Sequence, residues 1–154
     1  MLGEGDHREK LQQQIDAAGL THVAKMPGFQ TNAAAWYRTA SVFVLPSLVE
    51  GMPNVLLEAM VCRTPVISSN CESGPAEILE NSRLGTLVPI NDAVALQNAI
   101  ADVRNNSVEA ADRVEAAEKT LAARWTIQAA TVRLQGILTA AARGESGFSE
   151  NCRR

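Results

Sequence analysis

The chain has 154 residues, a length that suits one folded domain with a buried core. Hydrophobic residues make up 46% and charged residues 20%, which is typical of a soluble globular protein, and no apolar run reaches the roughly 18 residues that span a bilayer. The net charge of -3 and the aromatic content of 4% supply neither the basic surface nor the stacking rings that nucleic-acid binding requires. We therefore expect no nucleic-acid partner.

The start of the chain and its cysteines bear on its compartment. Leu-Gly-Glu-Gly-Asp follows Met1 directly, instead of the basic and apolar segments of a secretory signal, so we expect a cytoplasmic location. Cys62, Cys71 and Cys152 are an odd set without C-x-x-C spacing. They are predicted to be free thiols, not a disulfide framework or a zinc site.

The first third of the chain reads as two helices around a short strand. Apolar residues at helical spacing predict a helix over residues 10–18, which Gly19 would end. Residues 23–26, followed by Pro27, read as a strand, and residues 33–39 as a second helix.

The middle of the chain alternates strands with helices. Continuous apolar runs at 41–46 and 65–69 have the length of parallel strands covered on both faces, and 86–88 supplies another strand. Helical segments at 55–62 and 75–79 lie between them. This order predicts an α/β fold, a Rossmann-like parallel sheet with flanking helices.

The last third is helical. Asp92 can cap a helix over residues 93–104, and a long Ala-rich region over 108–142 is helical with a break near Trp125. We place one domain at residues 1–143 and a flexible tail at 144–154.

In open parallel sheets, ligands bind beyond the carboxyl ends of the strands. The loops at this position are those that follow Leu45 and Ser69. The first loop carries Glu50 and Gly51, and Pro53 and Asn54 then begin the helix that holds Glu58. A helix start offers free amide groups and a positive dipole end for a diphosphate, and glycine allows a close approach. Carboxylates accept hydrogen bonds from sugar hydroxyls. From spacing alone, solvated charges around an ordinary helix start remain an equal alternative.

Longer segments give this pattern a family resemblance. Residues 47–60 (SLVEGMPNVLLEAM) closely resemble the E-x7-E signature of the family-4 glycosyltransferases, retaining enzymes with the two-domain GT-B fold. The similarity continues through 64–69 (TPVISS), 73–79 (SGPAEIL) and 85–92 (GTLVPIND), and covers about residues 1–140.

The resemblance implies a role for each matching residue. Glu50 would face the donor sugar near its reacting carbon as the catalytic-site carboxylate, without acting as a covalent nucleophile, and Glu58 would hold the ribose hydroxyls. The donor sugar and phosphates would contact Gly51, Met52, Pro53, Asn54, Val55 and Gly5. Gly5 belongs to a Gly-Glu-Gly turn similar to a glycine-rich turn of the family, although a plain turn explains it equally well. No metal and no cofactor are expected.

Two features depart from the family pattern. Arg63 stands where members usually carry a glycine in the left-handed conformation that ends a helix. The family's segments with a Gly-Arg pair and a lysine, and its acceptor-binding N-terminal domain, have no counterpart before Gly3. We therefore expect a fragment whose sheet has an exposed edge, and whose partner is the missing N-terminal GT-B domain.

The resemblance thus implies the donor-binding half of a retaining glycosyltransferase. The expected donor is a nucleotide-diphospho-sugar, preferably UDP-linked, and the acceptor a polysaccharide or glycolipid that receives a hexose or N-acetylhexosamine. The full enzyme could associate peripherally with the inner membrane face, and this chain alone would be inactive. The alternative is a catalytically inactive nucleotide-sugar-binding module. A dinucleotide-dependent oxidoreductase is disfavoured, because Arg8 replaces the third glycine of its fingerprint.

Overall fold

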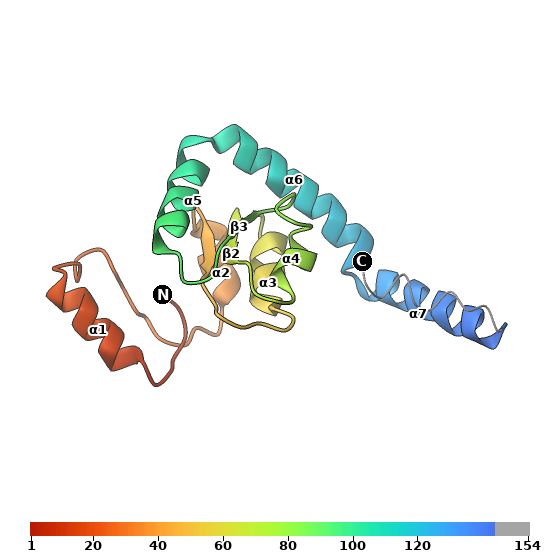
Figure 1. The fold of residues 1–154 in the computed structure, drawn as a ribbon, viewed down its shortest axis with the longest axis horizontal. Helices are drawn as coiled ribbons and strands as arrows, with labels where there is room; N and C mark the ends of the chain where they lie inside the picture. The colour runs from red at the N-terminus through yellow and green to blue at the C-terminus, as the bar shows by residue number, and fades with distance from the viewer. Residues whose placement is uncertain (144–154) are drawn as a thin grey trace. The chain divides into compact units, whose positions relative to one another are not determined.

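The computed structural model describes residues 1–143, which fall into two compact units. The first unit is Met1–Trp36 and the second begins at Tyr37. The helices and strands of both are labelled in Figure 1. Each unit is described below by itself.

The first unit is built around one helix. α1 spans Arg8–Ala17 and ends before Gly19, whose φ of 69° is the left-handed conformation expected after a helix. The predicted strand at 23–26 is wrong: the amides of Val23 and Ala24 both donate to the Leu20 carbonyl and form a turn. A strand needs a neighbour, and the bridge recorded in this unit, between Leu2 and Gly28, lies outside residues 23–26.

The second unit contains a parallel sheet that confirms the predicted α/β class. Its strands are β1 (Phe43–Leu45), β2 (Val66–Ser69) and β3 (Thr86–Val88), in the order β1-β2-β3. All of β2 is buried, whereas β1 is half-buried. β1 is therefore less buried than the sequence predicted for a strand covered on both faces. Among the described residues no strand pairs with the outer side of β1, so the expected open edge is present.

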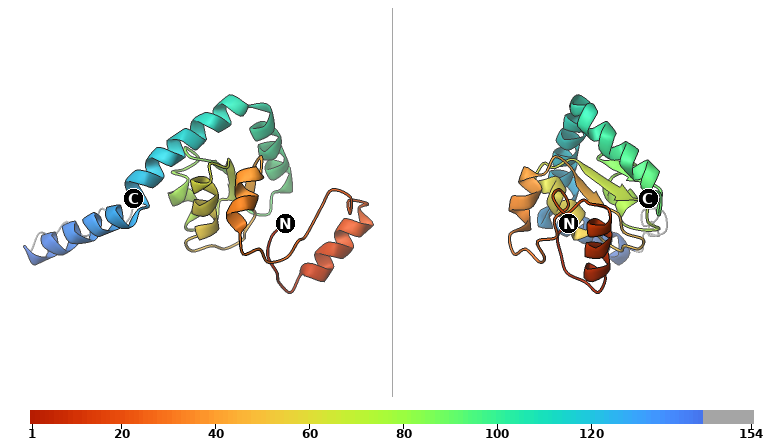
Figure 2. Two further views of the ribbon diagram at one scale, coloured as in Figure 1. Left: turned by 180° about the vertical axis from the view of Figure 1, so that it is seen from behind. Right: turned by 90° about the vertical axis from the view of Figure 1, so that its left-hand side faces the viewer.

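Helices cover both faces of the sheet (Figures 1 and 2). α3 (Asn54–Val61) packs against β1 and β2, and α5 (Ala93–Asn105) packs against β2 and β3. Ile67 of β2, Val88 of β3 and Ala99 of α5 form a buried cluster on the α5 side. The Asp92 carboxylate accepts a hydrogen bond from the Ala95 amide at 2.8 Å, which confirms the predicted cap of α5.

The remaining helices are α2 (Ala33–Thr39), α4 (Pro75–Ile78), α6 (Ser107–Arg124) and α7 (Ile127–Ala142). α6 packs on α3 and α5, and the predicted break near Trp125 is confirmed, since that residue is the C-cap of α6. Cys62 and Cys71 are free thiols, as predicted. Cys152 and the predicted tail at 144–154 lie outside the described residues. No helix within residues 1–143 is both long and apolar enough to cross a membrane.

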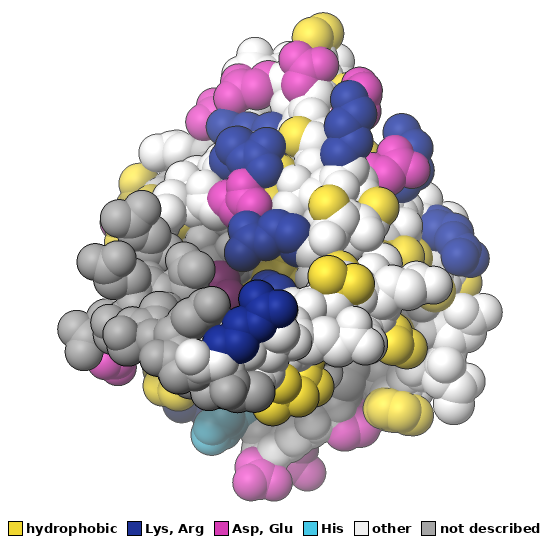
Figure 3. All heavy atoms as spheres, turned by 90° about the vertical axis from the view of Figure 1, so that its right-hand side faces the viewer, with side chains coloured by type: hydrophobic (Ala, Val, Ile, Leu, Met, Phe, Trp, Pro, Cys, Tyr) yellow, Lys and Arg dark blue, Asp and Glu magenta, His cyan; other side chains and the backbone are white. Residues whose placement is uncertain are grey.

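Ion pairs tie α6 to the rest of the second unit. Arg63 has a φ of 62°, the left-handed conformation for which the resemblance predicted a glycine, and its guanidinium donates to Glu118 of α6 at 2.6 Å. A hydrogen bond from Arg83, together with one from Arg124 of α6, lowers the pKa of the Glu80 carboxyl. The face drawn in Figure 3 accordingly shows basic and acidic side chains next to one another.

Gly85, at the entry to β3, is a position where the packing tolerates no side chain. A Cβ there would lie 2.6 Å from a methyl of Val66 and 2.9 Å from the Val66 carbonyl oxygen. We predict that Gly85→Ala lowers the free energy of unfolding by about 1–3 kcal/mol, measured by urea denaturation, because neighbouring atoms must shift. The control is Gly136→Ala in α7, where a Cβ meets nothing within 4 Å and stability should stay equal or rise. Equal effects of the two changes would contradict this packing.

Candidate functional site

The loops that follow β1 and β2 are joined by hydrogen bonds. They span residues 46–53 and 70–74 and begin at the carboxyl ends of neighbouring parallel strands, where Leu45 pairs with Ser68. The Ser73 hydroxyl donates to the Glu50 carbonyl at 3.0 Å, and the Cys71 thiol donates to the Ser47 carbonyl at 3.1 Å. These two bonds fix the backbone on both sides of residues 48 and 49.

Gly74 brings the second loop into direct contact with the first. Its φ is 86°, and a Cβ at this position would stand 2.2 Å from the Gly51 carbonyl oxygen and 2.8 Å from the Pro53 ring. Only glycine allows both this backbone conformation and this approach. Gly74 is also the N-cap residue of α4.

Six of the predicted site residues, 50–55, form one continuous segment that leads into the start of α3. Pro53 is the N-cap residue and no side chain caps the helix, so its first amide groups carry no side-chain partner. Gly51, Met52, Asn54 and Val55 are exposed along this segment. The Leu56 amide donates to the Pro53 carbonyl at 2.9 Å. The amides of Asn54 and Val55 and the positive end of the dipole are therefore what the helix start offers a ligand, next to the loop that carries Glu50.

The two glutamates have different surroundings. Glu50 is half-buried, and one oxygen of its carboxylate accepts a hydrogen bond from the Ser47 hydroxyl at 2.6 Å. Glu58 is exposed and lies four residues into α3, about 6 Å along the axis from Asn54. The hydroxyl of the buried Tyr37 approaches a Glu58 oxygen at 3.5 Å. The Glu50 carboxylate is thus hydrogen-bonded within its own loop, whereas the Glu58 carboxylate is contacted by the Tyr37 hydroxyl.

Gly5 lies in the first unit, in the turn before α1, where its carbonyl accepts a hydrogen bond from the Arg8 amide at 3.0 Å. This contact is that of an ordinary turn. Its implied role at the phosphates stays a prediction.

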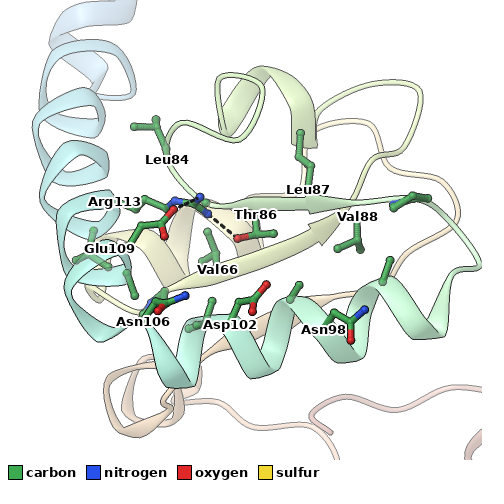
Figure 4. Close-up of a pocket in the computed structure, with 18 residues that line it drawn as sticks. Val66, Leu84, Thr86, Leu87, Val88, Asn98, Asp102, Asn106, Glu109 and Arg113 are labelled. Carbon is green, nitrogen blue, oxygen red and sulfur yellow. Dashed lines mark hydrogen bonds and ion pairs between the residues drawn. The ribbon is translucent and has the colours of Figure 1, made fainter.

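A separate groove of about 490 Å³ lies between β3, α5 and α6. Figure 4 shows Arg113 at one end, with Asp102 and Asn98 along α5. Arg113 donates to the Thr86 hydroxyl and to the Glu109 carboxylate, both at 2.7 Å, so its charge is already satisfied inside the groove. None of the predicted site residues lines this groove. We attribute it to the small side chains Ala95 and Ala99, which leave space beside an edge strand.

Sequence reasoning missed three residues that shape the site. Ser73 was noted only as part of a resembling segment, Gly74 only as a helix start, and Tyr37 only as part of a helix. The local pattern of Gly74 followed by Pro75 signals a helix start but not what the glycine touches. The distance along the chain between Tyr37 and Glu58 hides their contact from any local pattern.

Comparison with known proteins gives the family. Residues 1–120 match the family model described as glycosyl transferases group 1. The chain belongs to this family. The match includes both loops, α3 and the whole sheet.

Curated relatives of this group 1 glycosyltransferase chain are longer proteins of saccharide biosynthesis. It is 38% identical over 110 residues to the putative colanic acid biosynthesis glycosyltransferase WcaL of Salmonella typhimurium, and 30% identical over 131 residues to the lipopolysaccharide core biosynthesis glycosyltransferase LpsD of Rhizobium meliloti. These alignments cover 66% and 85% of the chain. The chain spans only 27% and 38% of the length of these two relatives.

Solved structures confirm the GT-B type of fold. HepE from Anabaena, crystallised with UDP-glucose, matches with a TM-score of 0.75 and 25% identity over 91% of this chain and 38% of HepE. TarM matches with a TM-score of 0.79 and 21% identity over 88% of this chain and 27% of TarM.

The contact between the two loops yields a stability prediction. Gly74→Ala should lower the free energy of unfolding by about 2–4 kcal/mol, because the new methyl group overlaps the Gly51 carbonyl and the residue must keep a left-handed conformation. Urea denaturation measures the change. The matched control is Gly51→Ala, where a Cβ meets nothing within 4 Å and stability should stay within about 1 kcal/mol. A Gly74→Ala protein as stable as this control would show that the loops do not pack as described.

Proposed function

We propose that the chain is the donor-binding half of a retaining, family-4-type glycosyltransferase that uses a nucleotide-diphospho-sugar, preferably a UDP-sugar. The observation that carries the proposal is the uncapped start of α3, set between a loop carboxylate, Glu50, and a helix carboxylate, Glu58. Free amides suit the diphosphate, and the carboxylates suit hydroxyls on either side of it. A nucleotide-sugar has these groups in the same order.

The relatives support the choice of donor and acceptor. HepE binds UDP and UDP-glucose, and LpsD and WcaL are named for lipopolysaccharide and colanic acid biosynthesis. We propose that the product of the whole enzyme is a polysaccharide or glycolipid extended by a hexose or N-acetylhexosamine. An N-terminal GT-B domain would bind the acceptor, in the cytoplasm or at the inner face of the membrane. No metal or cofactor is assigned a role.

In the proposed reaction the bond between the anomeric carbon and the diphosphate oxygen breaks while the acceptor hydroxyl oxygen attacks from the same face, and the proton of that hydroxyl passes to the departing phosphate oxygen. Negative charge then grows on the leaving diphosphate, and the amides at the start of α3 are fixed donors that stabilise it. Backbone groups of residues 51–55 would line the sugar and phosphates. Glu50 would contact the sugar near its reacting carbon, with one oxygen already bonded to Ser47.

The ribose role of Glu58 is tested by binding. We predict that Glu58→Gln weakens the affinity for UDP by about tenfold or more, because a carboxylate forms stronger hydrogen bonds with hydroxyls than an amide does. Isothermal titration calorimetry measures the dissociation constant. Glu72→Gln is the control, since Glu72 is an exposed carboxylate of the neighbouring loop with no proposed contact to the ribose. If Glu58→Gln binds UDP as wild type does, the ribose role is wrong.

A separate transfer assay distinguishes an enzyme from a binding module. It uses the wild-type chain joined to the N-terminal half of a close relative. Donor binding without transfer by this joined protein, under conditions where the intact relative transfers, would favour the catalytically inactive nucleotide-sugar-binding module.

Gly51 offers a second test that does not disturb the fold. Because a Cβ at Gly51 meets no protein atom within 4 Å, Gly51→Ala should fold normally, yet the methyl group would project where the donor is proposed to lie. We predict at least a fivefold weaker affinity for a UDP-sugar, measured by calorimetry, from overlap with the ligand. Unchanged affinity for the UDP-sugar would place the donor away from this backbone.

A further inference from the structure

Tyr37 is fixed by three neighbouring elements of the second unit. Its ring packs edge-on against Phe43 of β1, with 5.3 Å between ring centroids and an interplanar angle of 85°. Its carbonyl accepts a hydrogen bond from the Thr64 hydroxyl at 2.7 Å, at the entry to β2. Its side chain ends at Glu58 of α3. With 6% of its surface exposed, Tyr37 has little freedom to move.

The polar end of this buried residue meets the exposed carboxylate. The Tyr37 hydroxyl lies 3.5 Å from Oε2 of Glu58, longer than the roughly 2.5–3.0 Å usual for an O–H···O bond, so the contact is a weak one. A contact of this length restricts where the carboxylate can lie and leaves most of its acceptor capacity free. A carboxylate has about four lone-pair directions, and a pair of vicinal hydroxyls uses two.

The protonation of Tyr37 suits such a contact. Burial first, and then the adjacent Glu58 carboxylate, raises the pKa of the Tyr37 hydroxyl above its ordinary value. The groups that face the hydroxyl are Glu58 and Cys62, and both favour its neutral form. The hydroxyl therefore stays a donor throughout the neutral range, and Glu58 is its acceptor.

We propose that Tyr37 is a positioning residue for nucleotide recognition: its hydroxyl holds the Glu58 carboxylate in the orientation that accepts the two ribose hydroxyls. The inference rests on the proposed function, since it takes Glu58 as the ribose ligand. Without the tyrosine hydroxyl, an exposed glutamate samples several rotamers, and binding must first order it. Tyr37 itself touches no ligand in this arrangement.

The test compares two ligands that differ only in the ribose hydroxyls, UDP and 2′,3′-dideoxy-UDP, by calorimetry at neutral pH. The variants are Tyr37→Phe, Glu58→Gln and the double variant. Tyr37→Phe keeps the ring against Phe43 and the bond from Thr64, so the fold is retained. It should weaken UDP binding by about two- to tenfold, the range expected for one hydrogen bond. Binding of the dideoxy compound should not change, and Tyr37→Phe should add nothing in the Glu58→Gln background.

A structural role would give a different pattern. Thr64→Val removes another polar contact of Tyr37 but leaves the hydroxyl beside Glu58, so it should lower stability without changing the ratio of the two affinities. Equal losses for both ligands after Tyr37→Phe would overturn the positioning role. So would a Tyr37→Phe protein with wild-type affinity for UDP when Glu58→Gln has lost it, and that result would leave the proposed function standing. If Glu58→Gln itself binds UDP normally, the ribose role of Glu58 and the positioning role of Tyr37 both fall, while donor binding by the chain stands.

Discussion

The close contact between Gly74 and the backbone of Gly51 is the constraint on which the site depends. Parallel strands deliver their two loops to the same edge of the sheet, but the strands alone do not fix the loops against each other. The missing Cβ of Gly74 lets the loops touch, and the bonds from Ser73 and Cys71 then tie them at two further points. The start of α3 inherits its position from this arrangement, because Pro53 packs against the same glycine.

Local signals in the sequence predicted most of the second unit. The bounds of α2 and β3 agree with the prediction residue for residue, because apolar runs of the right length are flanked there by turn residues. The conformation of Arg63 was anticipated from a family position that ordinarily holds glycine, and its φ of 62° agrees. Its ion pair with Glu118 could not be anticipated, since the partners are 55 residues apart.

The failures also have physical causes. Residues 23–26 have strand composition, yet Val23 is 65% exposed and its amide closes a turn, since β propensity alone does not make a strand without a partner. Similarly, β1 has the apolar run of a strand covered on both faces, but it is only half-buried and lies at an edge of the sheet, where among the described residues it has one neighbouring strand. The composition of a segment indicates which secondary structure it can form, and its neighbours in the fold decide whether that structure forms and is buried.

The surroundings of the two glutamates argue for a division of labour. Glu50 is bonded within its own loop to Ser47, and that loop is tied to the next, so its carboxylate is set by backbone geometry at the mouth of the sheet. Glu58 projects from a regular helix, and the hydroxyl of the buried Tyr37 contacts one of its carboxylate oxygens. A carboxylate beside a reacting carbon must resist displacement while charge redistributes, which favours the loop-bound Glu50 for that place. A carboxylate that recognises a vicinal pair of ring hydroxyls needs free acceptor capacity with a defined orientation, which is the role proposed for Glu58.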